Sequence, residues 1–275
     1  MKIVTSTCVF PKEYPLESAI DRLAKVGFDS LDLDICALAE YKDSPFRTDK
    51  WEDWAKSVRD IAEKNGIAFT HSHAAGESNS RGEIFNRNFE ICRVLGIKTT
   101  VLHPKWLNSE RSAYRSEDEF LSVNVPAYKG LLGIAEENDV KILAENLLFG
   151  SVAEPQIISK LVSEVNSPYF GWCYDTGHAN FNKIPCTCLL KLENVPLSLH
   201  VQDNNQTVDD EHLIPGDGNI DWKLFARVLK DIGYKGEFVL EAHHQTLEAP
   251  DHEREALFEK MIERSREIVD YYNTL

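Results

Sequence analysis

The chain has 275 residues, of which 43% are hydrophobic and 27% are charged, the composition of a folded globular protein rather than of a disordered one. Its 45 acidic and 30 basic residues give a formal net charge of -15, which argues against a nucleic-acid partner because the mean field repels polyanions. The chain has no secretion signal, no apolar run of about 18 residues and no paired framework among its six cysteines, so we expect a cytoplasmic protein with reduced thiols and no membrane span.

Short apolar or β-branched runs alternate along the chain with longer segments of helical spacing. The runs occupy residues 2–9, 28–35, 66–73, 98–104, 139–147, 170–177, 196–203 and 236–243. Several of the helical segments end at a glycine, as helix C-caps do, namely Gly27, Gly66, Gly96 and Gly233. Because each parallel strand needs a covering crossover helix, this alternation predicts an α/β fold, a single (β/α)8 TIM barrel over residues 1–275. An open doubly wound sheet is the alternative, but the first turn, CVFPKEYPLE, lacks its glycine-rich phosphate motif.

Polar side chains collect where the predicted strands end. In a TIM barrel these carboxyl ends and the loops after them form the active-site face. Seven of the nine histidines lie at such ends. In chain order, the residues there are His71, His73, His103, Glu145, Asn146, Asp175, His178, His200, Asp203, Glu241, His243 and His244. We expect at most one of His243 and His244 to face the site, because adjacent strand residues point to opposite faces.

Each of the last four predicted strands contributes one residue that can bind a metal, namely Glu145, Asp175, His200 and Glu241. Three carboxylates buried together cannot all stay charged and unpaired. A divalent cation resolves this conflict, and oxygen-rich ligation with one nitrogen suits Mn²⁺, Mg²⁺, Co²⁺ or Fe²⁺. The alternative is a metal-free network in which groups such as Lys98, Lys105 or Lys141 neutralise the acids.

The segments LAENL, YDTGHAN, SLHVQDN, HLIPGDGNIDW and FVLEAHH resemble the xylose isomerase-like TIM barrel superfamily. The resemblance covers nearly the whole chain and is to the sugar isomerase and epimerase branch, which includes tagatose and psicose 3-epimerases and inosose isomerase-like proteins. It implies that Glu145, Asp175, His200 and Glu241 bind one divalent metal, that Glu145 and Glu241 form an acid/base pair, and that His178 faces the substrate. We also expect His73, His103 and Lys105 to contact the substrate.

The implied reaction is isomerisation or epimerisation of a keto sugar or a polyol-derived ketone. A proton is removed next to a carbonyl, and a metal stabilises the resulting enediolate. Predicted strands five and eight lie three apart in the ring, so Glu145 and Glu241 should approach a bound sugar from different sides. One carboxylate can then remove the proton while the other returns it. A dehydratase can use the same enediolate chemistry.

A second enzyme of the superfamily, endonuclease IV, offers a different interpretation of the same histidines. Its trinuclear zinc pattern can be followed here through His73, His103, Glu145, Asp175, His178, His200, Asp210, His212 and Glu241. On this hypothesis the ions, which we expect to be zinc, would activate a hydroxide that attacks a phosphodiester. Two features disfavour this hypothesis. Endonuclease IV has an H-A-P-Y segment whose Tyr lies at the abasic site, whereas this chain has H-A-A-G at residues 73–76. The net charge of -15 also disfavours a duplex partner. A second metal therefore remains open, as does a non-catalytic barrel that binds carbohydrate.

Other positions refine these expectations. Ser151 and Gln206 stand where ketose 3-epimerases carry a substrate-binding Glu and Arg, so the sugar or polyol used is not specified. Trp106, Trp172 and Phe149 form either an apolar wall against the sugar or part of the core. Within IPGDGNIDW we expect Asn219 or Asp221 to cap the following helix. Homo-oligomers are common among such barrels, and we expect one here by analogy alone.

Overall fold

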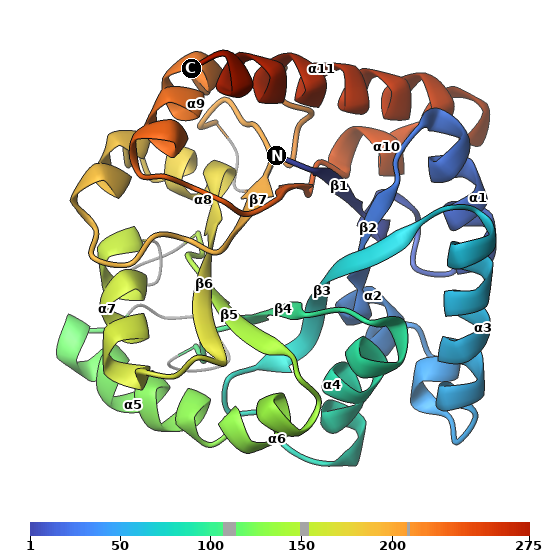
Figure 1. Cartoon of the computed structure of the whole chain (residues 1–275), viewed down its shortest axis with the longest axis horizontal. Helices are drawn as coiled ribbons and strands as arrows, with labels where there is room; N and C mark the ends of the chain where they lie inside the picture. Colours follow the sequence, from blue (N-terminus) through green and yellow to red (C-terminus); the bar gives the residue numbers. More distant parts are fainter. Residues whose placement is uncertain (107–113, 149–153, 208–209) are drawn as a thin grey trace.

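The computed structural model describes residues 1–106, 114–148, 154–207 and 210–275. Phe149 and Ser151 lie outside the described residues. Eight parallel strands close into a barrel in chain order, β1 to β8, and Figure 1 shows the helices in a ring around them. The strands are β1 (Ile3–Ser6), β2 (Ser30–Asp34), β3 (Ala68–Glu77), β4 (Thr99–His103), β5 (Lys141–Glu145), β6 (Phe170–Asp175), β7 (Ser198–Val201) and β8 (Phe238–Leu240). The predicted (β/α)8 barrel is confirmed.

The outer ring combines long helices with short helical turns. The α-helices are α1 (Leu16–Val26), α2 (Ile35–Glu40), α3 (Trp51–Lys64), α4 (Glu83–Leu95), α5 (Glu117–Lys129), α6 (Leu132–Glu137), α7 (Pro155–Val165), α8 (Thr176–Phe181), α9 (Trp222–Asp231), α10 (His244–Glu248) and α11 (Arg254–Thr274). The 3₁₀ helices are η1 (Thr7–Val9), η2 (Pro45–Arg47), η4 (Cys186–Lys191) and η5 (Asp251–Glu253). Across the described residues, no helix is both long and apolar enough to cross a membrane.

Glycine follows the end of four helices as expected. Gly27 follows α1 with φ 106°, Gly66 follows α3 with φ 70°, Gly96 follows α4 with φ 77° and Gly233 follows α9 with φ 69°, all in the left-handed region that glycine enters without steric penalty. The N–H of Gly27 donates to carbonyls in the last turn of α1, so the helix stops where the sequence indicated.

Two of the segments with helical spacing form less helix than that spacing indicates. Residues 117–139 have such spacing throughout but are divided into α5 and α6 around Gly130, and Arg81 donates to the Ala127 carbonyl at 2.9 Å at the end of α5. Residues 186–195 also have it but form only the short 3₁₀ helix η4, since Thr187 and the neighbouring cysteines are weak helix formers. The sixth crossover is instead begun by α8, which starts directly after Asp175.

The apolar core lies mainly between the strands and the surrounding helices. Trp172 is fully buried in it, and its indole N–H donates to the Asn194 carbonyl at 3.0 Å. Trp172 is therefore a core residue and not a wall of the site. Inside the barrel, Val101, Leu143 and Cys173 form a separate buried cluster. The polar residues of the candidate site lie around the carboxyl ends of these same strands.

Candidate active site and metal centre

Four neighbouring strand ends bring the predicted metal ligands together. Glu145 ends β5, Asp175 ends β6, His200 lies in β7 and Glu241 directly follows β8. Asp175 pairs in register with His200 across the β6–β7 ladder, so their side chains are neighbours. One ligand atom from each of the four residues lies within 4.8 Å of the ligand atoms of the other three. The predicted convergence is therefore observed.

His200 lies at the centre of this group. Its Nδ1 is 2.8 Å from Oε1 of Glu145 and 3.2 Å from Oε2 of Glu241. Burial lowers the pKa of the imidazole, but the thiol of Cys173 and these two carboxylates outweigh it, and the pKa stands well above its ordinary value. The His200 imidazole thus lies between two of the acids, close to both.

The carboxylates of the group retain free coordination capacity. Among the described residues, Oε2 of Glu145 and Oδ2 of Asp175 are buried without a hydrogen-bond partner. Burial raises the pKa of Asp175 to about 7 against the opposing effect of His178. Burial alone would also raise the pKa of Glu241, but His200 outweighs it and lowers the value to about 2. Buried, partly orphaned carboxylate oxygens beside one imidazole nitrogen fit a divalent cation.

Lysine does not supply the missing charge. In the part of the chain that the structure describes, the only side-chain cations within ion-pair distance of Glu145, Asp175 and Glu241 are histidines. Lys98, one of the lysines considered above, pairs with Asp139 instead. The metal-free network neutralised by lysine or arginine is not observed.

The segment DTGHAN turns the chain from β6 into α8. One oxygen of Asp175 accepts the backbone N–H of His178 at 2.6 Å and so caps α8. The other oxygen remains available to the group formed with Glu145, His200 and Glu241. Gly177 is needed for close packing, because a Cβ there would lie 2.0 Å from Oε1 of Gln202. Asn146 fixes the same turn by accepting the Asp175 N–H at 2.9 Å.

His178 belongs to a second group, with Asp210 and His212. Its Nδ1 donates to the Asn146 carbonyl at 2.8 Å, which directs Nε2 toward Oδ1 of Asp210 at 3.4 Å. Nε2 of His212 lies 2.7 Å from the same oxygen. Burial would raise the pKa of Asp210, but the two imidazoles hold it well below its ordinary value.

A third group joins His73 and His103 to Glu145. The Nε2 atoms of the two rings are 3.1 Å apart and lie 3.7 Å and 3.2 Å from Oε2 of Glu145. Burial would lower the pKa of His73, but Glu145 and Glu241 raise it to about 9, whereas burial keeps that of His103 below its ordinary value. Glu145 therefore belongs both to this group and to the group with Asp175, His200 and Glu241.

Members of all three groups line a cavity of about 370 Å³ at the barrel mouth, although Asp175 and His200 are not among its lining residues. Of the predicted site residues, Glu145, Glu241, His73, His103 and His178 line it, together with His243. His244 points away and pairs with Glu248, so one of the two adjacent histidines faces the site, as expected.

Lys105 is not among the cavity-lining residues. Its backbone N–H donates to Ser78 and Asn124 at 3.1 and 2.8 Å, and its predicted contact with substrate stays a prediction.

Part of the cavity follows the first two strands, which the strand-end residues named above do not include. The lining residues there are Cys8, Phe10, Pro11, Lys12, Cys36 and Ala37, with Asp34 at the end of β2 and Leu247 opposite on α10. Their position directly after a strand end was the signal that could have identified them. Phe10 and Leu247 supply the apolar surface that had been expected from the tryptophans.

The IPGDGNIDW loop is held by Asp203. Its Oδ1 accepts the N–H groups of Asn204 and Ile220 at 2.9 and 3.2 Å, and its Oδ2 accepts those of Gly216 and the Trp222 indole at 2.8 and 2.9 Å. Asp203 is thus the structural centre of the loop rather than a ligand. The expected cap of the following helix is Asp221, which accepts the Leu224 N–H at 2.9 Å.

Comparisons with known proteins agree with this architecture. A family model described as xylose isomerase-like TIM barrel matches residues 20–268. An uncharacterized protein of Methanocaldococcus jannaschii is 29% identical over 254 residues, which are 88% of this chain and 83% of that protein. The crystal structure of a D-tagatose 3-epimerase-like protein has a TM-score of 0.76 at 24% identity and covers 100% of this chain and 99% of that one. A crystal structure of the IOLI protein with a binding zinc atom has a TM-score of 0.79 at 20% identity and covers 99% of each chain.

Proposed function

Because the chain belongs to the xylose isomerase-like TIM barrel family, we propose that it is a divalent-metal-dependent isomerase or epimerase of a keto sugar or a polyol-derived ketone. The observation that carries the proposal is the convergence of Glu145, Asp175, His200 and Glu241 within 4.8 Å beside a cavity of about 370 Å³. Cavities of a few hundred Å³ accommodate small molecules of this kind.

The four residues would hold a single divalent cation, and Mn²⁺, Mg²⁺, Co²⁺, Fe²⁺ and Zn²⁺ are the candidates. A cation there supplies positive charge beside the carbonyl and hydroxyl oxygens of the substrate, where negative charge develops when a proton leaves the adjacent carbon. Oδ2 of Asp175 supports this arrangement, because it is buried and has no hydrogen-bond partner among the described residues.

Glu145 and Glu241 would transfer the protons. Both carboxylates line the cavity, and the pKa of Glu145 stands well below its ordinary value because the imidazoles outweigh the effect of burial. An ionised carboxylate can remove a proton from one side of the substrate, and a second one can return it from the other. His73, His103 and His178 would orient the hydroxyl groups, and Phe10 and Leu247 would pack against the apolar face of the sugar.

Hydrogen exchange with solvent tests the proposal without requiring the exact sugar. The purified chain with Mn²⁺ or Co²⁺ is incubated in deuterated water with a panel of ketoses and inososes, and deuterium at carbon is measured by NMR. We expect exchange in at least one member of the panel, and we expect Glu145→Gln and Glu241→Gln to slow it by about 10²-fold or more. The matched control is Glu248→Gln on α10, whose carboxylate pairs with His244 outside the cavity lining. Exchange that survives both site variants would defeat the acid/base roles.

A second candidate, a multi-metal phosphodiester hydrolase, is favoured by one observation. The groups His73–His103–Glu145 and His178–Asp210–His212 flank the four-residue group, so the site has ligands for more than one ion. The net charge of -15 argues against a duplex substrate. Binding and cleavage of an abasic duplex at low salt test this candidate, and a duplex that is neither bound nor cut eliminates it.

A further inference from the structure

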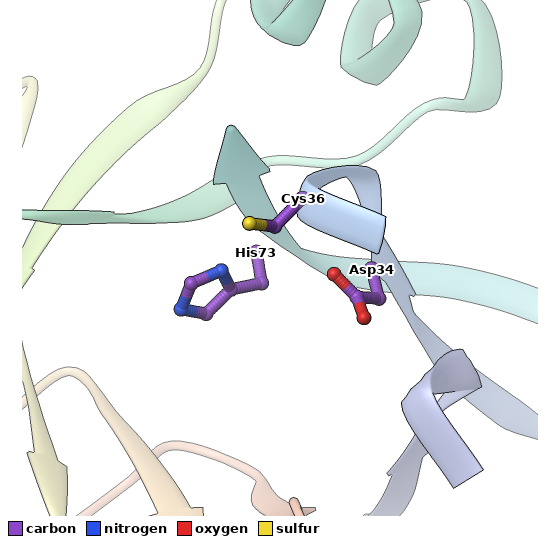
Figure 2. Close-up of side chains that lie close together, drawn as sticks. All are labelled: Asp34, Cys36 and His73. Atoms are coloured by element: carbon purple, nitrogen blue, oxygen red, sulfur yellow. The ribbon is translucent and has the colours of Figure 1, made fainter. Parts of the chain in front are cut away.

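Three side chains with different ligand chemistry meet on the wall of the cavity. Asp34 ends β2, Cys36 lies in the first turn of α2, and His73 pairs in register with Asp34 across the β2–β3 ladder. One ligand atom from each lies within 4.8 Å of the other two. Figure 2 shows the three side chains close together, with the Cys36 sulfur above the His73 ring and one ring nitrogen turned toward the sulfur. Neither Asp34 nor Cys36 belongs to the centre described above.

Each of the three side chains has an uncommitted ligand atom. Oδ1 of Asp34 accepts the Ala37 N–H at 3.0 Å, which leaves Oδ2 available. Nε2 of His73 faces His103 and Glu145, so Nδ1 is the ring nitrogen that remains for a ligand shared with Asp34 and Cys36. Neither this Nδ1 nor the Cys36 sulfur makes a hydrogen bond or ion pair within the described part of the chain.

A ligand set of one sulfur, one nitrogen and one oxygen favours some metal ions over others. Thiolate with imidazole and carboxylate suits Zn²⁺ and other thiophilic divalent ions, whereas Mg²⁺ and Mn²⁺ prefer oxygen-rich sites. Three protein ligands leave one tetrahedral position open toward the cavity. A catalytic thiol is the competing role for Cys36, but burial, with Asp34 next in effect, raises its pKa to about 12, which makes the free thiol a weak nucleophile.

We propose that Asp34, Cys36 and His73 form a second, thiolate-containing cation site for zinc-class ions, distinct from the oxygen-rich centre around Glu145. Binding replaces the thiol proton of Cys36, which passes to solvent, with a metal–sulfur bond. The site shares His73 with the substrate cavity of the proposed function, whereas Asp34 and Cys36 have no part in the proposed sugar chemistry.

Cadmium is the probe, because a thiolate ligand gives an ultraviolet sulfur-to-cadmium charge-transfer band that carboxylates and imidazoles do not. Cd²⁺ is titrated into the full chain in excess Mg²⁺, which competes for the oxygen-rich centre. We expect a saturable band corresponding to one thiolate per chain. Cys36→Ser should abolish it, and Asp34→Asn should weaken Cd²⁺ affinity by roughly tenfold or more.

Three controls make the result specific. Cys8→Ser removes the other thiol of the same cavity and Cys186→Ser removes one on η4, and both should keep the band. Glu145→Gln should also keep it, which separates failure of this site from failure of the proposed function. A band that persists in Cys36→Ser, or that disappears in Cys8→Ser, overturns the proposal. Should Cys36→Ser fail to fold, zinc X-ray absorption of the wild-type chain decides: a sulfur at about 2.3 Å supports the site and an all-oxygen or nitrogen shell contradicts it.

Discussion

Nδ1 of His200 lies 2.8 Å from Oε1 of Glu145, although the two residues stand on β7 and β5, which do not pair with each other. The contact crosses the end of β6, where one oxygen of Asp175 has no hydrogen-bond partner within the described ranges of the chain. The imidazole and the acids therefore face a common point at the barrel mouth.

Asp175→Asn should separate metal binding from folding. Asparagine caps helices as well as aspartate does, so the His178 N–H keeps an acceptor and the stability should change by less than about 1 kcal/mol. The lost carboxylate should weaken Mn²⁺ binding by about 10- to 100-fold, as measured by isothermal titration calorimetry. Asp221→Asn makes the same exchange at the cap of α9 and should leave affinity unchanged. Equal Mn²⁺ affinity in the two variants would remove Asp175 from the ligand set.

Gly177→Ala should destabilise the turn after β6. The added Cβ would lie 2.0 Å from Oε1 of Gln202, so the Gln202 side chain must move, and its Nε2 loses the 3.0 Å hydrogen bond that it donates to Oδ1 of Asp210. We expect a loss of about 1–3 kcal/mol in the free energy of unfolding, measured by chemical denaturation. Gly133→Ala in α6 is the control, since a Cβ there meets no atom within 4 Å and should stabilise the helix by about 0.5–1 kcal/mol. Equal effects at the two glycines would contradict the packing argument.

Asp203→Asn should destabilise the loop between β7 and α9. The carboxylate accepts four hydrogen bonds, two of them from Gly216 and the Trp222 indole, and an amide can accept with only one of its two terminal atoms. The expected loss is about 2–4 kcal/mol in the free energy of unfolding. Asp231→Asn at the exposed end of α9 should change it by no more than about 0.5 kcal/mol. A near-neutral Asp203→Asn would show that the loop is held by other contacts.

Asp217 should make stability depend on pH. Burial would raise its pKa, but Gln245 and Lys260, at 2.7 and 2.6 Å from Oδ2, outweigh it and lower the pKa in the folded state. A depressed pKa stabilises the fold above the unfolded value of about 3.9 and loses that contribution as the pH falls through the folded value. Asp217→Asn should therefore lower the free energy of unfolding by about 1 kcal/mol at neutral pH and have less effect in acid. Urea unfolding across this range measures the difference, and a difference that does not vary with pH would exclude the ion pair as its cause.

The alternation of apolar runs and helical segments was sufficient to predict the barrel, because a parallel strand buried on both faces leaves a continuous apolar signal. Position directly after such a run also predicted which polar residues converge, as with Glu145, Asp175 and Glu241. Spacing along one strand could not show that Lys105 would lie outside the cavity lining, since the direction of a loop side chain depends on tertiary contacts such as those with Ser78 and Asn124.

The contribution of the first two strands was harder to predict. Asp34 and Cys36 are far in sequence from the other site residues, and closure of the barrel brings them beside His73. Trp172 shows the opposite case, because it lies within β6, three residues before Asp175, and alternate strand residues face opposite sides of the sheet. Its side chain therefore faces the helices, where the indole N–H donates to the Asn194 carbonyl.

The most direct test of the metal centre is anomalous X-ray diffraction from crystals soaked in Mn²⁺, recorded at the manganese absorption edge. Our account predicts a strong peak about 2.0–2.6 Å from ligand atoms of Glu145, Asp175, His200 and Glu241. If saturating Mn²⁺ leaves no peak between these four side chains, or if they are seen to point apart, the barrel mouth holds no such ion and the proposed chemistry fails with it.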